Sequence, residues 1–91
     1  MKITSFEHLG TVLRATRLAL NVPLADLADT LETSQTLLRR HEQGHTTIAI
    51  QKLFATMAEL GIEMHLFLPA AIQDEAIVSE NGVAKRKRAR P

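Results

Sequence analysis

The apolar residues of this chain follow a helical period up to residue 60 and then switch to the period of a strand. Over residues 6–60 they recur three and four positions apart, which is typical of helices with one apolar stripe. Over residues 62–68 they alternate with Glu63 and His65, the two-residue repeat of a strand with one buried face. The fold class predicted is all-α, with four to five helices and one C-terminal strand.

Capping and turn residues divide the helical part into four predicted segments. These segments are residues 6–20, 23–31, 34–43 and 47–60. Ser5 and Ser34 can cap the first and third segments, because a serine oxygen accepts hydrogen bonds from the free N–H groups of a first helical turn. Pro23 suits the first turn of the second helix. Gly44 and Gly61 can end the third and fourth helices, since glycine adopts a left-handed terminus without strain.

The predicted strand has no partner in an otherwise helical chain, and unpaired backbone N–H and C=O groups favour pairing with another strand. Pairing with the same strand of a second copy would give a two-fold homodimer. The expected dimerisation residues are Ile62, Met64, Leu66 and Leu68, helped by apolar residues of the fourth helix. The buried stripe expected on that helix is Ile50, Leu53, Phe54, Met57, Ala58 and Leu60. The alternative is an extended segment packed on the helices of its own chain.

The amino-acid composition excludes several classes of protein. Ninety-one residues with 45% hydrophobic side chains suffice for one domain with its own core. The absence of cysteine excludes a disulfide scaffold and any cysteine-ligated metal, and three aromatic residues are too few for a stacking platform on single-stranded nucleic acid. No apolar run approaches the roughly 20 residues of a membrane span, and no signal peptide is evident. A cytoplasmic protein is expected.

The net charge of +1 hides an asymmetry between body and tail. Five of the eleven Lys and Arg residues lie within residues 85–91, whereas residues 1–84 hold six basic and all ten acidic side chains. A basic arm favours a polyanionic partner, and a merely solvated tail is the alternative. We therefore expect a domain over residues 1–69, with its dimerisation strand at 62–68, and an extension over 70–91. In that extension a weak helix is expected over residues 70–77 and disorder from Val78.

Residues 23–44 describe two short helices joined by a tight turn, which is a helix-turn-helix. The segment resembles the helix-turn-helix of the Xre/Cro (lambda-repressor-like) family. The residues that carry the match are, in order, Leu27, Ala28, Leu31, Ser34, Gln35, Thr36, Leu38, Glu42, Gln43 and Gly44. With the fourth helix and the strand included, the resemblance covers about residues 6–68 and is greatest to HipB-type antitoxins, whose dimers pair such a strand.

In such a motif the second helix lies in the major groove and reads base edges. The base-reading candidates are Gln35, Thr36, Arg39 and Arg40, since glutamine can bond adenine and arginine can bond guanine at two atoms. Ser34 can cap the helix and lie beside a phosphate, and Arg14 and Arg17 on the first helix are weaker phosphate candidates. The acidic Asp26 and Asp29 must face away from DNA. The resemblance implies a repressor that binds operator DNA, associates with the nucleoid and binds a HipA-like serine/threonine kinase toxin.

Three residues depart from the family pattern. Leu24 stands where glutamine usually supports the recognition helix and touches phosphate. Glu32 stands where the turn often has glycine, so either its backbone is strained or the turn differs. His41 stands where an apolar residue is common.

An enzymatic function is not expected, and neither is a metal or a cofactor. His41 and His45 are four residues apart, but Gly44 should end the helix between them, and the chain has no His-Glu-x-x-His pattern. The four glycines are isolated, so no glycine-rich phosphate loop is present. Two alternatives to the antitoxin hypothesis stay open. One is a stand-alone Xre-type repressor, and the other is a protein-interaction module with reduced DNA binding, which Leu24, Leu37 and Leu38 would suit.

Overall fold

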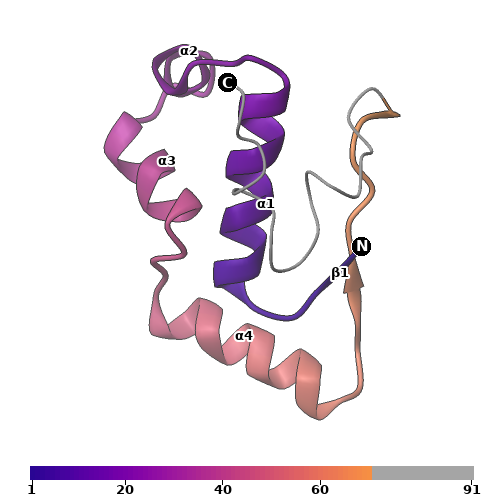
Figure 1. The fold of residues 1–91 in the computed structure, drawn as a ribbon. Coiled ribbons are helices and arrows are strands. Elements are labelled where there is room, and N and C mark those ends of the chain that lie inside the picture. The colour runs from indigo at the N-terminus through magenta and orange to yellow at the C-terminus, as the bar shows by residue number, and fades with distance from the viewer. Residues whose placement is uncertain (71–91) are drawn as a thin grey trace.

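The computed structural model describes residues 1–70 as four helices and a two-stranded antiparallel sheet (Figure 1). The helices are α1 (Phe6–Ala19), α2 (Leu24–Thr30), α3 (Gln35–Glu42) and α4 (Ile48–Glu59), and the strands are β1 (Lys2–Ile3) and β2 (Met64–His65). The mostly helical class is confirmed. Within the described residues no helix is long and apolar enough to cross a membrane. The expected helix over 70–77, the disorder from Val78 and the basic tail lie at or beyond the end of these residues.

Three of the four helices begin at a side-chain cap. The hydroxyl oxygens of Ser5, Ser34 and Thr47 accept hydrogen bonds from the backbone N–H groups of His8, Leu37 and Ile50. The two serine caps predicted from the sequence are therefore confirmed. Pro23 lies one position earlier than expected, because it is the N-cap of α2 and the helix begins at Leu24.

All four helices end in the same left-handed turn. Asn21, Glu32, Gly44 and Gly61 have φ of 58°, 57°, 83° and 75°. In each case the N–H of the next residue donates to the carbonyl five positions before it, which satisfies a terminal carbonyl of the helix. Of the two alternatives for Glu32, the structure shows the first, because the glutamate occupies a left-handed backbone conformation that favours glycine.

The helices α2 and α3 form a two-helix unit that packs against α1 through α3 (Figure 1). The contact between α1 and α3 is close at Gly10, where an added Cβ would collide with the backbone carbonyl of His41. At Gly44, which follows α3, an added Cβ would lie 2.9 Å from the Cα of Glu7. Two glycines thus let the end of α3 approach the backbone of α1.

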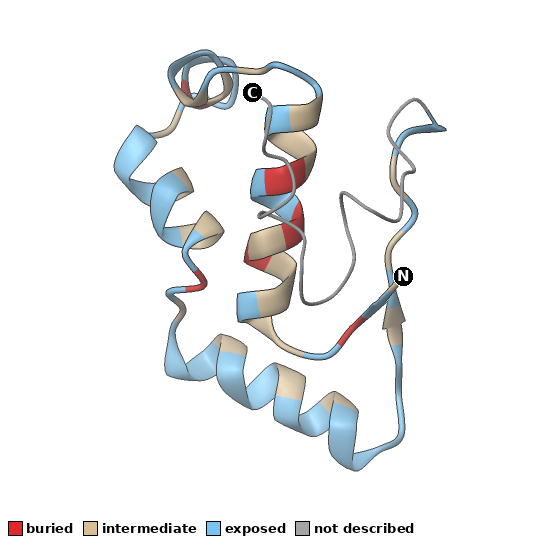
Figure 2. Ribbon diagram, in the orientation of Figure 1, coloured by how far each residue is buried: buried red, intermediate tan, exposed pale blue. Residues whose placement is uncertain are grey.

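The buried core is small and centres on α1 and β1. Ile3, Val12 and Ala15 form the buried cluster, and Ala28 is buried separately in α2 (Figure 2). Partly buried side chains pack around this cluster, namely Met1, Leu9, Phe54, Met64, Leu66 and Leu68. The N-terminal strand therefore supplies one of the few fully buried side chains of the domain.

The buried stripe predicted on α4 is wrong for its outer half. Ile50, Phe54 and Met57 are half-buried, but Leu53 and Leu60 are 50% and 68% exposed, and no residue of α4 is fully buried. Ala58, also in the predicted stripe, is exposed. The helical period identified the apolar side of α4 correctly, but the described elements cover only part of that side.

The strand has a partner in its own chain, which corrects the prediction of a lone strand. Strand β2 pairs antiparallel with β1 in the register Lys2↔His65 and Ile3↔Met64. Beyond these pairs, the backbones of Met1 and Leu66 exchange two hydrogen bonds of 2.9 and 2.8 Å. The regular strand is also shorter than the predicted segment 62–68. An N-terminal segment of about three residues thus pairs with one edge of the strand that was expected to be free.

This pairing also locates the four expected dimerisation residues. Met64, Leu66 and Leu68 pack against the core of their own chain. Ile62 differs, because it is 52% exposed at the end of α4. Three of the four side chains therefore already have apolar neighbours within one copy.

Candidate nucleic-acid interface

One side of α3 packs against the rest of the domain and the other side is open. Leu38, His41 and Glu42 are half-buried on the packed side. The exposed residues include all five candidates predicted from the sequence for this helix and its cap, namely Ser34, Gln35, Thr36, Arg39 and Arg40. The structure therefore brings these five residues together on one accessible helix, as Figure 2 shows by the exposed outer side of α3.

The first turn of α3 is well defined at its N-terminus. The Ser34 hydroxyl accepts the N–H of Leu37 at 3.0 Å. The Gln35 and Thr36 side chains follow this cap directly, where a recognition helix places its base contacts. Leu37 itself is 43% exposed, so an apolar side chain adjoins the polar ones.

The exposed side of α3 carries positive charge. Arg39 and Arg40 lie in its last turns, and the helix has no acidic residue in its first turn. Its single acidic residue, Glu42, is paired with Arg17. A polyanion at this side of α3 would therefore lie near two arginines, and the only carboxylate of the helix is already paired.

Arg17, a phosphate candidate in the sequence, is tied into the fold. Its Nε and Nη2 donate to the Glu42 carboxylate at 2.6 and 3.0 Å, and its Nη1 donates to the Val22 carbonyl at 3.0 Å. The two charged side chains are only 12% and 8% exposed. The hydrogen bond to Glu42 raises the pKa of Arg17, so the guanidinium stays charged.

Glu42 therefore has a structural role that its place in the sequence motif does not predict. Glu42 follows Leu38 by four residues, so both lie on the same side of α3, and Leu38 is half-buried. A carboxylate at such a position needs a charged partner, and this spacing was the available indication. The pair joins the last turn of α1 to the last turn of α3 and fixes how α3 is held.

Arg14 remains exposed on α1. It follows Gly10 by four residues, so both lie on the same face of the helix, and Gly10 is in close contact with the end of α3. This places the Arg14 cation next to the two-helix unit. Asp26 and Asp29 are exposed on α2, which keeps negative charge on the neighbouring helix.

Two of the four histidines, His41 and His65, have side-chain neighbours in the fold. The half-buried His41 ring lies edge-on to Phe6 with 6.1 Å between centroids, which accounts for a histidine at this apolar position. His65 Nε2 is 3.0 Å from a Glu63 carboxylate oxygen, and His45 is exposed. Within residues 1–70 no three His, Asp or Glu side chains converge on a point that would suit a metal ion.

Comparisons with known proteins add no assignment. No protein-family model, no curated protein and no solved structure matches this chain. The candidate site therefore rests on the two-helix unit, the exposed polar residues of α3 and the ion pair that holds α3 against α1.

Proposed function

We propose that the protein is a sequence-specific DNA-binding repressor in which α2 and α3 form a helix-turn-helix and α3 enters the major groove. The observation that supports this most is the convergence of Gln35, Thr36, Arg39 and Arg40 on the accessible side of one capped helix. Glutamine and arginine are the side chains that bond adenine and guanine edges at two atoms. Arg14 would contact a DNA phosphate beside the recognition helix.

The proposed repressor is a homodimer that reads an inverted repeat. Two recognition helices related by a two-fold axis contact half-sites about 34 Å apart along the duplex. The exposed apolar residues Leu53, Leu60 and Ile62, at α4 and the start of the strand segment, favour association of two copies there. Such a protein is cytoplasmic, has no catalytic site and requires no cofactor.

Within this class we place the protein with HipB-like antitoxins, which autoregulate their operon and bind a HipA-like serine/threonine kinase toxin. This finer assignment rests on the sequence resemblance over about residues 6–68. An adjacent open reading frame for such a kinase, and loss of its activity on co-expression with this chain, are the expected results. An unrelated neighbouring gene favours the stand-alone repressor instead.

One observation favours an interaction module as the second candidate. Leu37 is 43% exposed among the polar residues of α3, and an exposed leucine suits a protein partner as well as a base edge. In that case α3 binds a protein and DNA binding is weak.

The deciding experiment is selection from a library of random-sequence DNA duplexes at physiological salt. Enrichment of an inverted repeat by the native protein, and its loss in the Arg39→Ala/Arg40→Ala variant, supports the proposal. Lys52→Ala is the matched control, because Lys52 is an exposed cation on α4 away from α3. Recovery of no common sequence by the folded native protein contradicts it and leaves the interaction module.

A further inference from the structure

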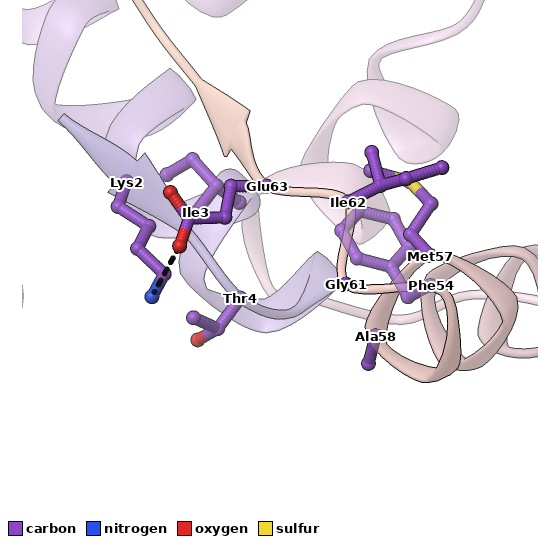
Figure 3. A pocket seen from close by; sticks show the side chains of 9 residues that line it. All are labelled: Lys2, Ile3, Thr4, Phe54, Met57, Ala58, Gly61, Ile62 and Glu63. Atoms are coloured by element: carbon purple, nitrogen blue, oxygen red, sulfur yellow. Dashed lines mark ion pairs between the residues drawn. The ribbon is translucent and has the colours of Figure 1, made fainter.

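A groove opens between β1 and α4, at the end of the two-stranded sheet (Figure 3). Its apolar lining includes Ile3 of β1 and three side chains of α4, namely Phe54, Met57 and Ala58. Its volume is about 280 Å³, just below the range of about 300–1,000 Å³ that is usual for small-molecule sites. The groove therefore suits one apolar group about the size of a single side chain rather than a drug-sized molecule.

Two side chains of opposite charge stand at the rim of this groove. Lys2 Nζ lies 3.4 Å from Glu63 Oε2, and the two side chains are 53% and 55% exposed. Figure 3 shows this ion pair on one side of the groove and Phe54 and Met57 on the other. The separation is longer than the roughly 2.7–2.9 Å of a charge-assisted hydrogen bond, so the ion pair is loose.

Neither charged group is satisfied by this ion pair alone. A lysine ammonium has three N–H donors, and a carboxylate has about four acceptor positions. Glu63 presents one oxygen to Lys2 and the other to His65, which lies 3.0 Å away at Nε2, so acceptor positions remain on both oxygens. A molecule that carries both an anion and a cation can therefore join the pair without breaking it.

We propose that this groove binds a free α-amino acid with an apolar side chain, such as leucine or methionine. The ligand side chain lies against Phe54, Met57 and Ala58, the α-carboxylate pairs with Lys2, and the α-ammonium pairs with Glu63. The mixed charge of the rim selects this class of ligand. An apolar acid would bring its carboxylate beside Glu63, and an apolar amine would bring its ammonium beside Lys2, so each is opposed by one of the two charges.

Titration of the native protein with L-leucine, followed by proton–nitrogen NMR, tests the site. A small ligand in an open groove is expected to bind with a dissociation constant of about 1 mM. The resonances expected to shift are those of β1 and of residues 57–63, and those of α3 are expected to stay in place. Leucinamide, which lacks the carboxylate, and N-acetylleucine, which lacks the ammonium, are each expected to bind at least about fivefold more weakly.

Two charge-removing variants identify which rim residue meets which group of the ligand. Lys2→Gln is expected to bind leucine as weakly as the native protein binds leucinamide, and to bind leucinamide with no further loss. Glu63→Gln is expected to show the same relation between leucine and N-acetylleucine. General damage to the fold would instead weaken all three ligands alike, so that result overturns the assigned contacts.

A space-filling variant and a charge control complete the test. Ala58→Phe is expected to abolish the leucine-dependent shifts by filling the groove, and Ala58 is exposed, so the fold is expected to remain. Lys52→Gln is the matched control, because Lys52 is an exposed cation of α4 that does not line the groove. Its affinity for leucine is expected to stay within about twofold of that of the native protein.

The titrations are made without DNA, so the inference does not rest on the proposed function. Failure of the DNA selection leaves this site standing, and failure of the leucine titration leaves DNA binding standing. Unshifted resonances of β1 and α4 at about 20 mM leucine, far above the expected dissociation constant, overturn the site. Equal affinities for leucine and leucinamide, or for leucine and N-acetylleucine, overturn the assigned class of ligand.

Discussion

Arg17 and Glu42 join the last turn of α1 to the last turn of α3 through two hydrogen bonds of 2.6 and 3.0 Å between guanidinium and carboxylate. The same guanidinium donates to the Val22 carbonyl in the turn between α1 and α2. One side chain therefore joins α1, the turn after it and α3, and the position of α3 depends on it.

Removing one partner of this pair is expected to destabilise the domain strongly. Arg17→Met leaves the Glu42 carboxylate, only 8% exposed, without its countercharge, and we expect a loss of about 3 kcal/mol in the free energy of unfolding. Urea denaturation followed by circular dichroism measures it. Arg17→Met/Glu42→Leu is the matched variant and should recover most of the loss, because no unpaired charge remains. If Arg17→Met is as stable as the native protein, the ion pair does not have this structural role.

Glu32→Gly is expected to stabilise the domain by about 1 kcal/mol, because it relieves a left-handed backbone at φ 57°. Glu32→Gln keeps the strain while removing the charge and should gain little. Asn21→Gly, at φ 58°, should gain less than Glu32→Gly, since asparagine tolerates this conformation better than glutamate. The measurement is the urea midpoint at constant slope, and a Glu32→Gly variant less stable than Glu32→Gln shows that the turn does not store strain.

Arg40→Ala is expected to cost about 1–3 kcal/mol in binding to the selected duplex and to relax the preference at one base pair of each half-site. Competition binding against duplexes changed at single positions measures both quantities. Arg14→Ala is the comparison, because a phosphate contact should weaken all sequences alike. Uniform weakening by Arg40→Ala instead assigns Arg40 to the phosphate backbone.

The pKa of the Glu63 carboxyl is lowered, first by the hydrogen bond from His65 and then by the charge of Lys2. A carboxyl with a lowered pKa in the folded state stabilises the fold above its unfolded pKa, and this contribution is lost as the pH falls through the folded value. Carbon-13 NMR titration should therefore show Glu63 titrating below an ordinary glutamate. His65→Ala and Lys2→Ala should each raise the Glu63 pKa toward its ordinary value. An unchanged Glu63 pKa in His65→Ala excludes the hydrogen bond as the main cause.

Local residue chemistry predicted the helices well. Ser5, Ser34, Gly44 and Gly61 fix helix ends through backbone bonds within a few residues, so their effect is visible in the sequence itself. The α3 candidates came from the helix-turn-helix pattern, and the structure shows them exposed. The family resemblance and its DNA-binding function stay predictions.

The errors have a common physical origin, which is contact between distant segments. Strand β1 is two residues long, too short for any period to identify, and its pairing partner lies more than 60 residues away. The sequence does not show whether the partner of Arg17 is a phosphate or Glu42. Periodicity likewise defines the apolar side of α4 but not what covers it.

The small core described above has a consequence for how the protein behaves in a cell. Only Ile3, Val12, Ala15 and Ala28 are fully buried apolar side chains among residues 1–70. A domain with so little interior gains much of its remaining stability from whatever binds its folded form, by mass action. Its folded fraction, and with it its lifetime against proteases that attack unfolded chains, then rises with the concentration of its own copies and partners.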